Sequence, residues 1–174
     1  EETLIETLEL IAKMAISQKS QSIFILWHGG EPLTLPIEYF KNAFTIVDEH
    51  IAKIQEKTNI GYSEGIQTSL IPFREEWVDI VKTRWSSHIG ASIDFSSRKL
   101  NGSVENYHNL FMKKVELARD HGITVTPGIV PSKSENGKAA EINRWMIERD
   151  FYEYNIDRYN SYGQYLTDKP SNYE

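Results

Sequence analysis

The amino-acid sequence predicts an α/β fold, specifically a partial (β/α)6 TIM-like barrel of parallel strands with helices outside. The first observation is that segments with helical and strand periodicity alternate, which is typical of parallel sheets joined by right-handed crossovers. The second is an apolar run at residues 23–27, which is too continuous for a half-exposed strand and indicates burial on both faces. The third is that the alternation begins on a helix, which predicts a barrel without its first strand.

The first elements follow directly from apolar spacing. Apolar residues recur on one face of a helix predicted at residues 2–17, and the buried strand follows at residues 22–28. A second helix is predicted from Pro36 to Lys57, and Pro36 suits its first turn because its fixed φ is helical. A second strand is expected at residues 62–69.

The later elements continue the same alternation. A short helix is predicted after Pro72, and a third strand at residues 88–94. Ser103 is a suitable N-cap for a helix that runs to Asp120. The remaining elements are a strand at 123–130, which Pro127 and Gly128 weaken, a helix at 136–149 and a strand at 151–158. The sequence therefore predicts one barrel-like domain at residues 1–160 and a loosely ordered tail at residues 161–174.

Composition excludes several classes of function. The chain has 174 residues, and 40% are hydrophobic, which is enough for one domain with a real core. Its net charge of −6 argues against nonspecific binding to nucleic acid. No signal peptide or membrane-length apolar run is visible, so a cytoplasmic protein without a membrane partner is expected. The sequence contains no cysteine, so this chain alone offers no thiolate for zinc or an iron–sulfur cluster.

The segment Gly29-Gly30-Glu31-Pro32 interrupts the chain directly after the buried strand. Two glycines suit a backbone that takes positive φ or that another molecule approaches closely, and Pro32 stiffens the turn. Ligands of parallel α/β folds bind at the carboxyl ends of strands, so this turn is a candidate ligand site. A purely structural turn is the alternative. The carboxyl ends of the predicted strands together form a rim, and polar residues gather along it: His28, Gln67, Thr68, Ser69, Ser92, Asp94, Asp157 and Arg158.

Three sequence blocks, taken together, resemble the radical S-adenosylmethionine superfamily. They are Trp27–Leu33, Ile66–Ile71 with the nearby Trp77, and Ile89–Asp94 followed by Gly102-Ser103-Val104. Their order and spacing are similar to those of the branch that contains anaerobic sulfatase-maturating enzymes and SPASM-type peptide maturases. The resemblance covers roughly residues 1–160.

This resemblance implies a cofactor site and an activity. The GGEP segment is expected to hold the amino group of the methionine moiety, Ser92 to lie near the ribose, and residues 128–130 near the adenine. Exposed carbonyls and a carboxylate at a glycine turn suit an ammonium group. The parent enzyme is expected to be an oxidoreductase that cleaves S-adenosylmethionine and uses the 5′-deoxyadenosyl radical to modify a ribosomal peptide or protein. The residues assigned to cofactor binding are Gly29, Gly30, Glu31, Pro32, Gln67, Ser92 and Asp94.

The sequence also departs from this family. The CxxxCxxC loop that binds the [4Fe–4S] cluster is absent, so the cluster is expected in the parent only, and this chain alone is expected to be inactive. No catalytic residue or metal ligand is assigned within it. The simplest interpretation is a core fragment. The alternatives are a non-catalytic, cluster-less binding module, or an unrelated α/β enzyme that acts on phosphates or sugar phosphates and shares only the glycine turn.

A missing first strand has a physical consequence for residues 22–28. Their backbone groups lose a neighbour on one side, and exposed strand edges invite pairing with another chain. We therefore expect either self-association through this open edge or its coverage by the residues after Asn160.

Overall fold

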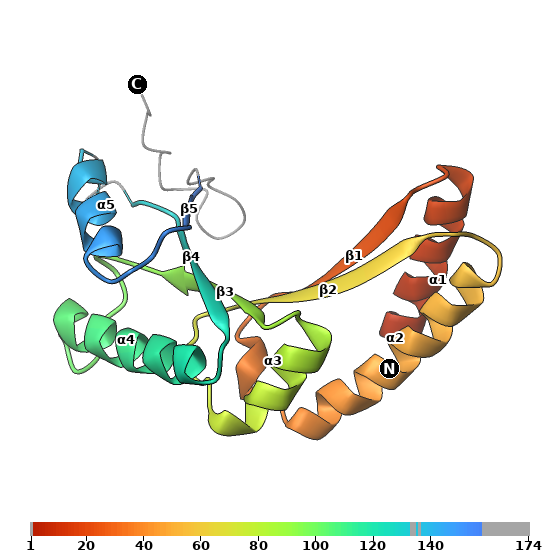
Figure 1. The fold of residues 1–174 in the computed structure, drawn as a ribbon, viewed down its shortest axis with the longest axis horizontal. Coiled ribbons are helices and arrows are strands. Elements are labelled where there is room, and N and C mark those ends of the chain that lie inside the picture. Colours follow the sequence, from red (N-terminus) through yellow and green to blue (C-terminus); the bar gives the residue numbers. More distant parts are fainter. Residues whose placement is uncertain (1, 133–134, 136, 158–174) are drawn as a thin grey trace.

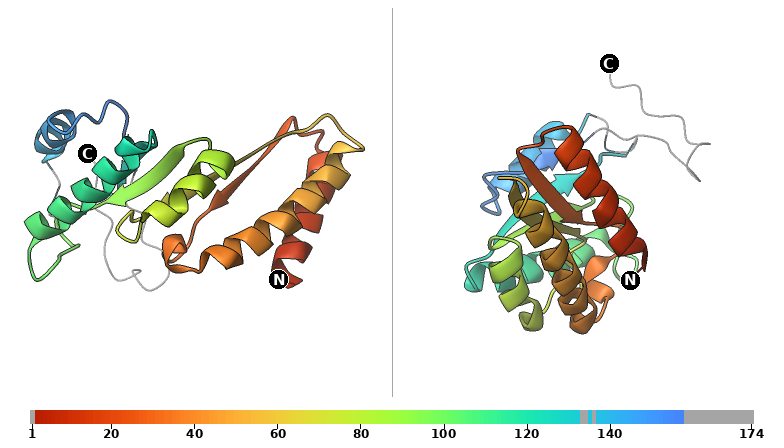
Figure 2. Two further views of the ribbon diagram at one scale, coloured as in Figure 1. Left: turned by 60° about the horizontal axis from the view of Figure 1, so that its bottom comes forward. Right: turned by 90° about the vertical axis from the view of Figure 1, so that its right-hand side faces the viewer.

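The computed structural model describes residues 2–132, 135 and 137–157. Within them, five strands form one sheet in the order β1-β2-β3-β4-β5, and every neighbouring pair is parallel. The sheet curls, and the helices pack around its outer side (Figures 1 and 2). The predicted partial barrel of parallel strands with helices outside is confirmed.

The first part of the barrel contains α1 (Glu2–Ser17), β1 (Ser22–Trp27) and α2 (Ile37–Gln55). A short 3-10 helix, η1 (Pro32–Thr34), follows the glycine turn and was not expected from the sequence. The two long helices lie side by side (Figure 1). Their shared face encloses a small core of Leu8, Ala15, Ile23, Val47, Ile51, Ile54 and Ile60.

The middle part contains β2 (Gly61–Thr68), η2 (Glu75–Trp77), α3 (Val78–Arg84) and β3 (His88–Ile93). The single short helix expected here is a 3-10 turn that leads into an α-helix. The rings of Trp77 and Trp85 stack 6.3 Å apart, and Phe40 of α2 meets both edge-on. This aromatic cluster joins α2 and α3 into the main core.

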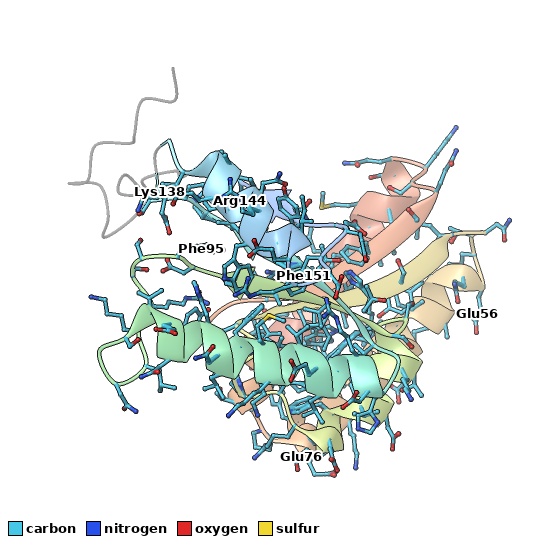
Figure 3. All side chains as sticks on the ribbon, turned by 60° about the vertical axis from the view of Figure 1, so that its left-hand side comes forward. Glu56, Glu76, Phe95, Lys138, Arg144 and Phe151 are labelled. Atoms are coloured by element: carbon cyan, nitrogen blue, oxygen red, sulfur yellow. The ribbon has the colours of Figure 1, made fainter. Side chains whose placement is uncertain are left out.

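The last part contains α4 (Val104–Asp120), β4 (Thr124–Ile129), α5 (Ala139–Ile147) and β5 (Asn155–Ile156). The Ser103 N-cap is confirmed, because its hydroxyl accepts a hydrogen bond from the Asn106 N–H at 3.2 Å. Phe95 and Phe151 lie beside α5 (Figure 3), and both rings pack on Trp145 of that helix. They help to fill the space between α5 and the sheet.

The fifth strand is much shorter than predicted. It has two residues, which pair only with Gly128 and Ile129, whereas a strand at 151–158 was expected. Phe151 instead enters the core, so the segment reaches β4 only at its far end. Pairing with β5 therefore begins at Gly128, one residue after Pro127, which has no N–H to donate. Arg158 and the predicted tail at 161–174 lie outside the described residues.

Side chains of the strands alternate between two faces, as they must in a pleated sheet. On the convex face, Ile66, Ile89 and Ile93 are buried beneath the helices. On the concave face, Phe24 and Leu26 remain exposed, so the prediction that the strand at 22–28 is buried on both faces is wrong: helices cover only its convex face. Within the described residues, β1 pairs with β2 alone, so the proposed response of its other edge stays a prediction. No helix in this part of the chain is long and apolar enough to span a bilayer.

Candidate functional site

One residue, His28, separates the end of β1 from the glycine turn. Gly29 has a φ of 108° and Gly30 a φ of 56°, a region that residues with a Cβ rarely adopt. A Cβ built on either glycine would meet nothing within 4 Å. The backbone conformation, rather than crowding, therefore explains the two glycines, and both peptide units border open space.

The Glu31 carboxylate fastens this turn to the end of β2. It accepts hydrogen bonds from the Leu33 N–H at 3.2 Å, from the Ser69 N–H at 2.8 Å and from the Thr68 hydroxyl. A carboxylate has about four lone-pair sites, so most of its capacity is used within the protein. Glu31 thus shapes the turn, and the exposed backbone of the turn is the part that faces outward. Pro32 follows as the first residue of η1 and is buried.

Gln67 and Ser92 meet on the concave face. The Gln67 Nε2 group donates to the Ser92 Oγ at 2.9 Å. A Cβ built on Gly90 would lie 2.2 Å from the Gln67 Oε1 atom, whereas one on Gly128 would lie 3.6 Å from Nε2. The carboxamide therefore lies flat across β3 towards β4, and this arrangement requires glycine at position 90.

Asp94 has a different environment. Its carboxylate accepts hydrogen bonds from the backbone N–H groups of Ser96, Ser97 and Arg98 and from the Ser97 hydroxyl. Partial burial alone would raise its pKa, but these four hydrogen bonds outweigh burial, and the net effect lowers the pKa. The structure thus places Asp94 as the organiser of its own loop, away from the concave hollow described below.

A third carboxylate joins two rim loops. Glu135 is buried, its Oε1 accepts from the Phe95 N–H at 3.0 Å, and its Oε2 accepts from the Ser132 N–H at 2.5 Å. The loop after β3 and the loop after β4 are thereby held together. Sequence periodicity gave no sign of this contact.

A hollow of about 420 Å³ occupies the concave face. At the carboxyl ends of the strands, the hollow contains His28, the Gln67–Ser92 pair and Asp157, all of which the sequence placed at the rim. Towards the amino ends its lining includes Phe24, and His88 Nε2 and Thr126 Oγ1 lie 2.8 Å apart. The complete lining is Phe24, Leu26, His28, Gly65, Ile66, Gln67, His88, Gly90, Ser92, Thr126, Gly128, Val130, Asn155 and Asp157.

Two rim residues were missed by the sequence interpretation. The Arg98 guanidinium donates to the Ser92 carbonyl at 3.0 Å and reaches the Tyr107 hydroxyl at 3.4 Å. Burial raises the pKa of Tyr107, and the Arg98 charge opposes that shift. Arg98 reaches Ser92 because Asp94 folds the intervening loop back. The only sequence signal was the Asp-Phe-Ser-Ser segment, which suits a side-chain-capped turn.

Fold and rim together define an α/β half-barrel with a glycine turn and a polar hollow at the carboxyl edge of its sheet. No family model matches the chain. The structure of native anSMEcpe, an anaerobic sulfatase-maturating enzyme, with bound AdoMet matches with a TM-score of 0.65 and 17% identity, covering 92% of this chain and 45% of that one. The same protein with AdoMet and the Kp18Cys peptide also matches with a TM-score of 0.65. These structures share the fold of this chain.

Curated sequences give a consistent result. A cysteine-type anaerobic sulfatase-maturating enzyme of Clostridium novyi is 21% identical over 149 residues, which cover 83% of this chain and 38% of the relative. An uncharacterised protein of Methanothermobacter thermautotrophicus is 24% identical over 123 residues, which cover 70% of this chain and 44% of that protein. The resemblance to the sulfatase-maturating branch of radical S-adenosylmethionine proteins is confirmed. The chain spans less than half the length of these matches.

Proposed function

We propose that this chain is the core of a radical S-adenosylmethionine enzyme that modifies a ribosomal peptide or protein. The observation that carries the proposal is the carboxyl edge of the sheet. There, an open left-handed Gly29-Gly30 turn stands beside the Gln67–Ser92 pair, on a fold shared with AdoMet-bound structures. The peptide substrate is proposed because the sulfatase-maturating structures include peptide complexes.

The residues at this edge fit the chemical groups of the cofactor. The exposed carbonyls of Gly29 and Gly30 suit an ammonium group, and the Ser92 hydroxyl and Gln67 carboxamide suit ribose hydroxyls. Arg98 donates to the Ser92 carbonyl, and its guanidinium suits the methionine carboxylate because it binds carboxylates with two parallel donors. When bound, S-adenosylmethionine supplies the adenosyl group that takes a hydrogen atom from the substrate.

In this proposal the residues assigned to cofactor binding divide into two roles. Gly29, Gly30, Gln67 and Ser92 contact the cofactor. Glu31, Pro32 and Asp94 hold the backbone that carries these contacts, since both carboxylates are occupied by protein donors.

An iron–sulfur cluster does not fit this chain. The sequence has no cysteine, and the described residues contain no group of three or more His, Cys, Asp or Glu that could hold a metal ion. We therefore derive no step through a cluster and propose that the chain alone does not cleave S-adenosylmethionine. The test is anaerobic reconstitution with iron and sulfide, followed by dithionite and S-adenosylmethionine. 5′-Deoxyadenosine above a no-protein control would contradict this proposal.

The binding site is tested by Gly30→Val in the full protein that contains this chain. A β-branched residue resists the positive φ of position 30, so the turn must change shape. We expect S-adenosylmethionine affinity, measured by calorimetry, to fall by about tenfold or more, equivalent to roughly 1.4 kcal/mol. Gly122→Val is the matched control. Gly122 also has a positive φ, of 71°, and open space around a built Cβ, but it lies before the amino end of β4, away from the glycine turn. Equal affinity in both variants would show that the turn is structural.

The lack of cysteine favours one second candidate, a binding module without catalysis. It predicts that the full-length protein also lacks a CxxxCxxC segment. If the full protein carries that segment but remains inactive after reconstitution, the enzyme proposal gives way to this one.

A further inference from the structure

Trp27 is the last residue of β1, two positions before Gly29, and its indole is held from two directions. The ring meets Phe40 and Phe44 edge-on, at centroid distances of 5.4 and 5.6 Å. Its Nε1–H donates to the Glu64 Oε2 atom at 2.6 Å. The packing sets the position of the ring, and the hydrogen bond sets its rotation.

Glu64 is an unusual acceptor because it is a buried carboxylate. Its side chain is 2% exposed, and its second oxygen accepts from Arg84. Arg84 also binds both oxygens of Asp48 at 2.9 Å and stacks over the Phe44 ring. Burial and the adjoining Glu64 carboxylate raise the pKa of Tyr62, the remaining titratable group here.

A buried ion pair is a weak source of stability, since desolvation of both charges offsets most of their attraction. Replacing a buried ion pair with well-packed apolar residues often costs a protein no stability. What the charged arrangement adds is direction, because only a polar acceptor fixes the indole N–H. Glu64 therefore has a role that packing alone does not explain.

The glycine turn is fastened to β2 on both sides. After the turn, Glu31 accepts from the Ser69 N–H at the end of β2. Before the turn, Trp27 donates to Glu64 within β2. Between these two attachments, Gly29 and Gly30 have no side chains that could hold their peptide units in place.

We propose that Glu64, acting through the Trp27 indole N–H, is a positioning residue for the glycine turn and hence for S-adenosylmethionine. This inference rests on the proposed function for its ligand. Its structural part, that Glu64 limits the movement of Gly29 and Gly30, is independent of the ligand.

The central variant is Trp27→Phe, which keeps an aromatic ring against Phe40 and Phe44 but removes the donor. Trp85→Phe is the matched control. Trp85 packs against the same two phenylalanines, and its buried Nε1 has no hydrogen-bond partner within the described structure. Both variants shrink a tryptophan in the same cluster. Trp85 is the more deeply buried of the two, so the control loses at least as much packing as Trp27→Phe.

Calorimetry on the full protein measures S-adenosylmethionine affinity, and hydrogen exchange measures the Leu33 and Ser69 amides, which donate to the Glu31 carboxylate of the turn. We expect Trp27→Phe to weaken binding about tenfold and to speed exchange of these two amides. Trp85→Phe should leave both within about twofold, although thermal unfolding shifts in each variant. Glu64→Gln should weaken binding less than Trp27→Phe, because an amide oxygen still accepts, and the double variant should bind no worse than Trp27→Phe.

The outcomes separate the two proposals. Equal affinity and equal exchange in Trp27→Phe and Trp85→Phe would overturn the positioning role. If the unmodified protein does not bind S-adenosylmethionine, the proposed function and the ligand part of this inference fail together. Exchange in the turn then decides whether Glu64 holds it.

Discussion

The two faces of the sheet are built from alternating residues of the same strands, yet they differ sharply. In β1, Ile23 is buried on the convex face, while the neighbouring Phe24 is 61% exposed on the concave face. In β3, Ile89 and Ala91 are fully buried under helices, while Gly90 and Ser92 border the hollow.

This difference separates the chemistry of folding from that of binding. The convex face supplies large apolar side chains that exclude water, which is the dominant favourable contribution to folding. The concave face supplies glycines over which longer side chains lie. A Cβ on Gly65 would be 2.9 Å from the Phe24 ring, and one on Gly90 would collide with Gln67. Changes on the convex face should therefore cost stability, and changes on the concave face should mainly alter binding.

The largest expected effect is on the convex side. Phe40→Ala removes a fully buried ring that contacts Trp27, Trp77 and Trp85. We expect the free energy of unfolding, measured with urea, to fall by about 3–5 kcal/mol because a large cavity forms. A loss below about 1 kcal/mol would contradict the assignment of this face as the folding core.

A sharper test uses adjacent residues on opposite faces. Ile23→Ala should lower the free energy of unfolding by about 2–3 kcal/mol, because its side chain is buried against α1 and α2. Phe24→Ala should change it by no more than about 0.5 kcal/mol, although the ring is larger, because most of it is already in water. Equal losses in urea unfolding would show that the concave face also stabilises the fold.

The smallest effect concerns Asp94 at the rim. Because the folded pKa is lowered, its ionised form stabilises the fold above the unfolded pKa, and this contribution is lost as pH falls through the folded value. Asp94→Asn should therefore cost about 1 kcal/mol at neutral pH through its weakened hydrogen bonds. The difference from the unmodified protein should shrink in urea unfolding below roughly pH 4. Asp79→Asn, at the exposed start of α3, controls for the loss of one surface charge.

Much of the fold could be predicted because its signals are local. The helical spacing of apolar residues and the Ser103 cap depend only on neighbours in sequence. The apolar run at 23–27 likewise predicted a strand, but not the exposure of its concave face, which depends on what covers the sheet. The short β5 could not be predicted, since the point at which residues 151–156 meet β4 depends on where Phe151 enters the core.

The site was predictable at the level of which segments meet, but not of what each side chain does. Parallel topology places the ends of β1, β2 and β3 at one edge, so Gly30, Gln67 and Ser92 were expected together. The Glu31 partner, Ser69, lies 38 positions away, and no local pattern specifies such a pairing. Arg98 was missed for the same reason, because its approach to Ser92 depends on the loop that Asp94 organises.

The hydrogen bonds of Glu135 couple two loops. Because this one buried carboxylate accepts from the N–H of Phe95 and from the N–H of Ser132, it connects the loop after β3 to the loop after β4. Displacing either loop alone would break a hydrogen bond to a buried carboxylate, so we expect the two loops to move together. We therefore expect that a molecule which displaces the loop after β3, beside Ser92, also displaces the loop after β4.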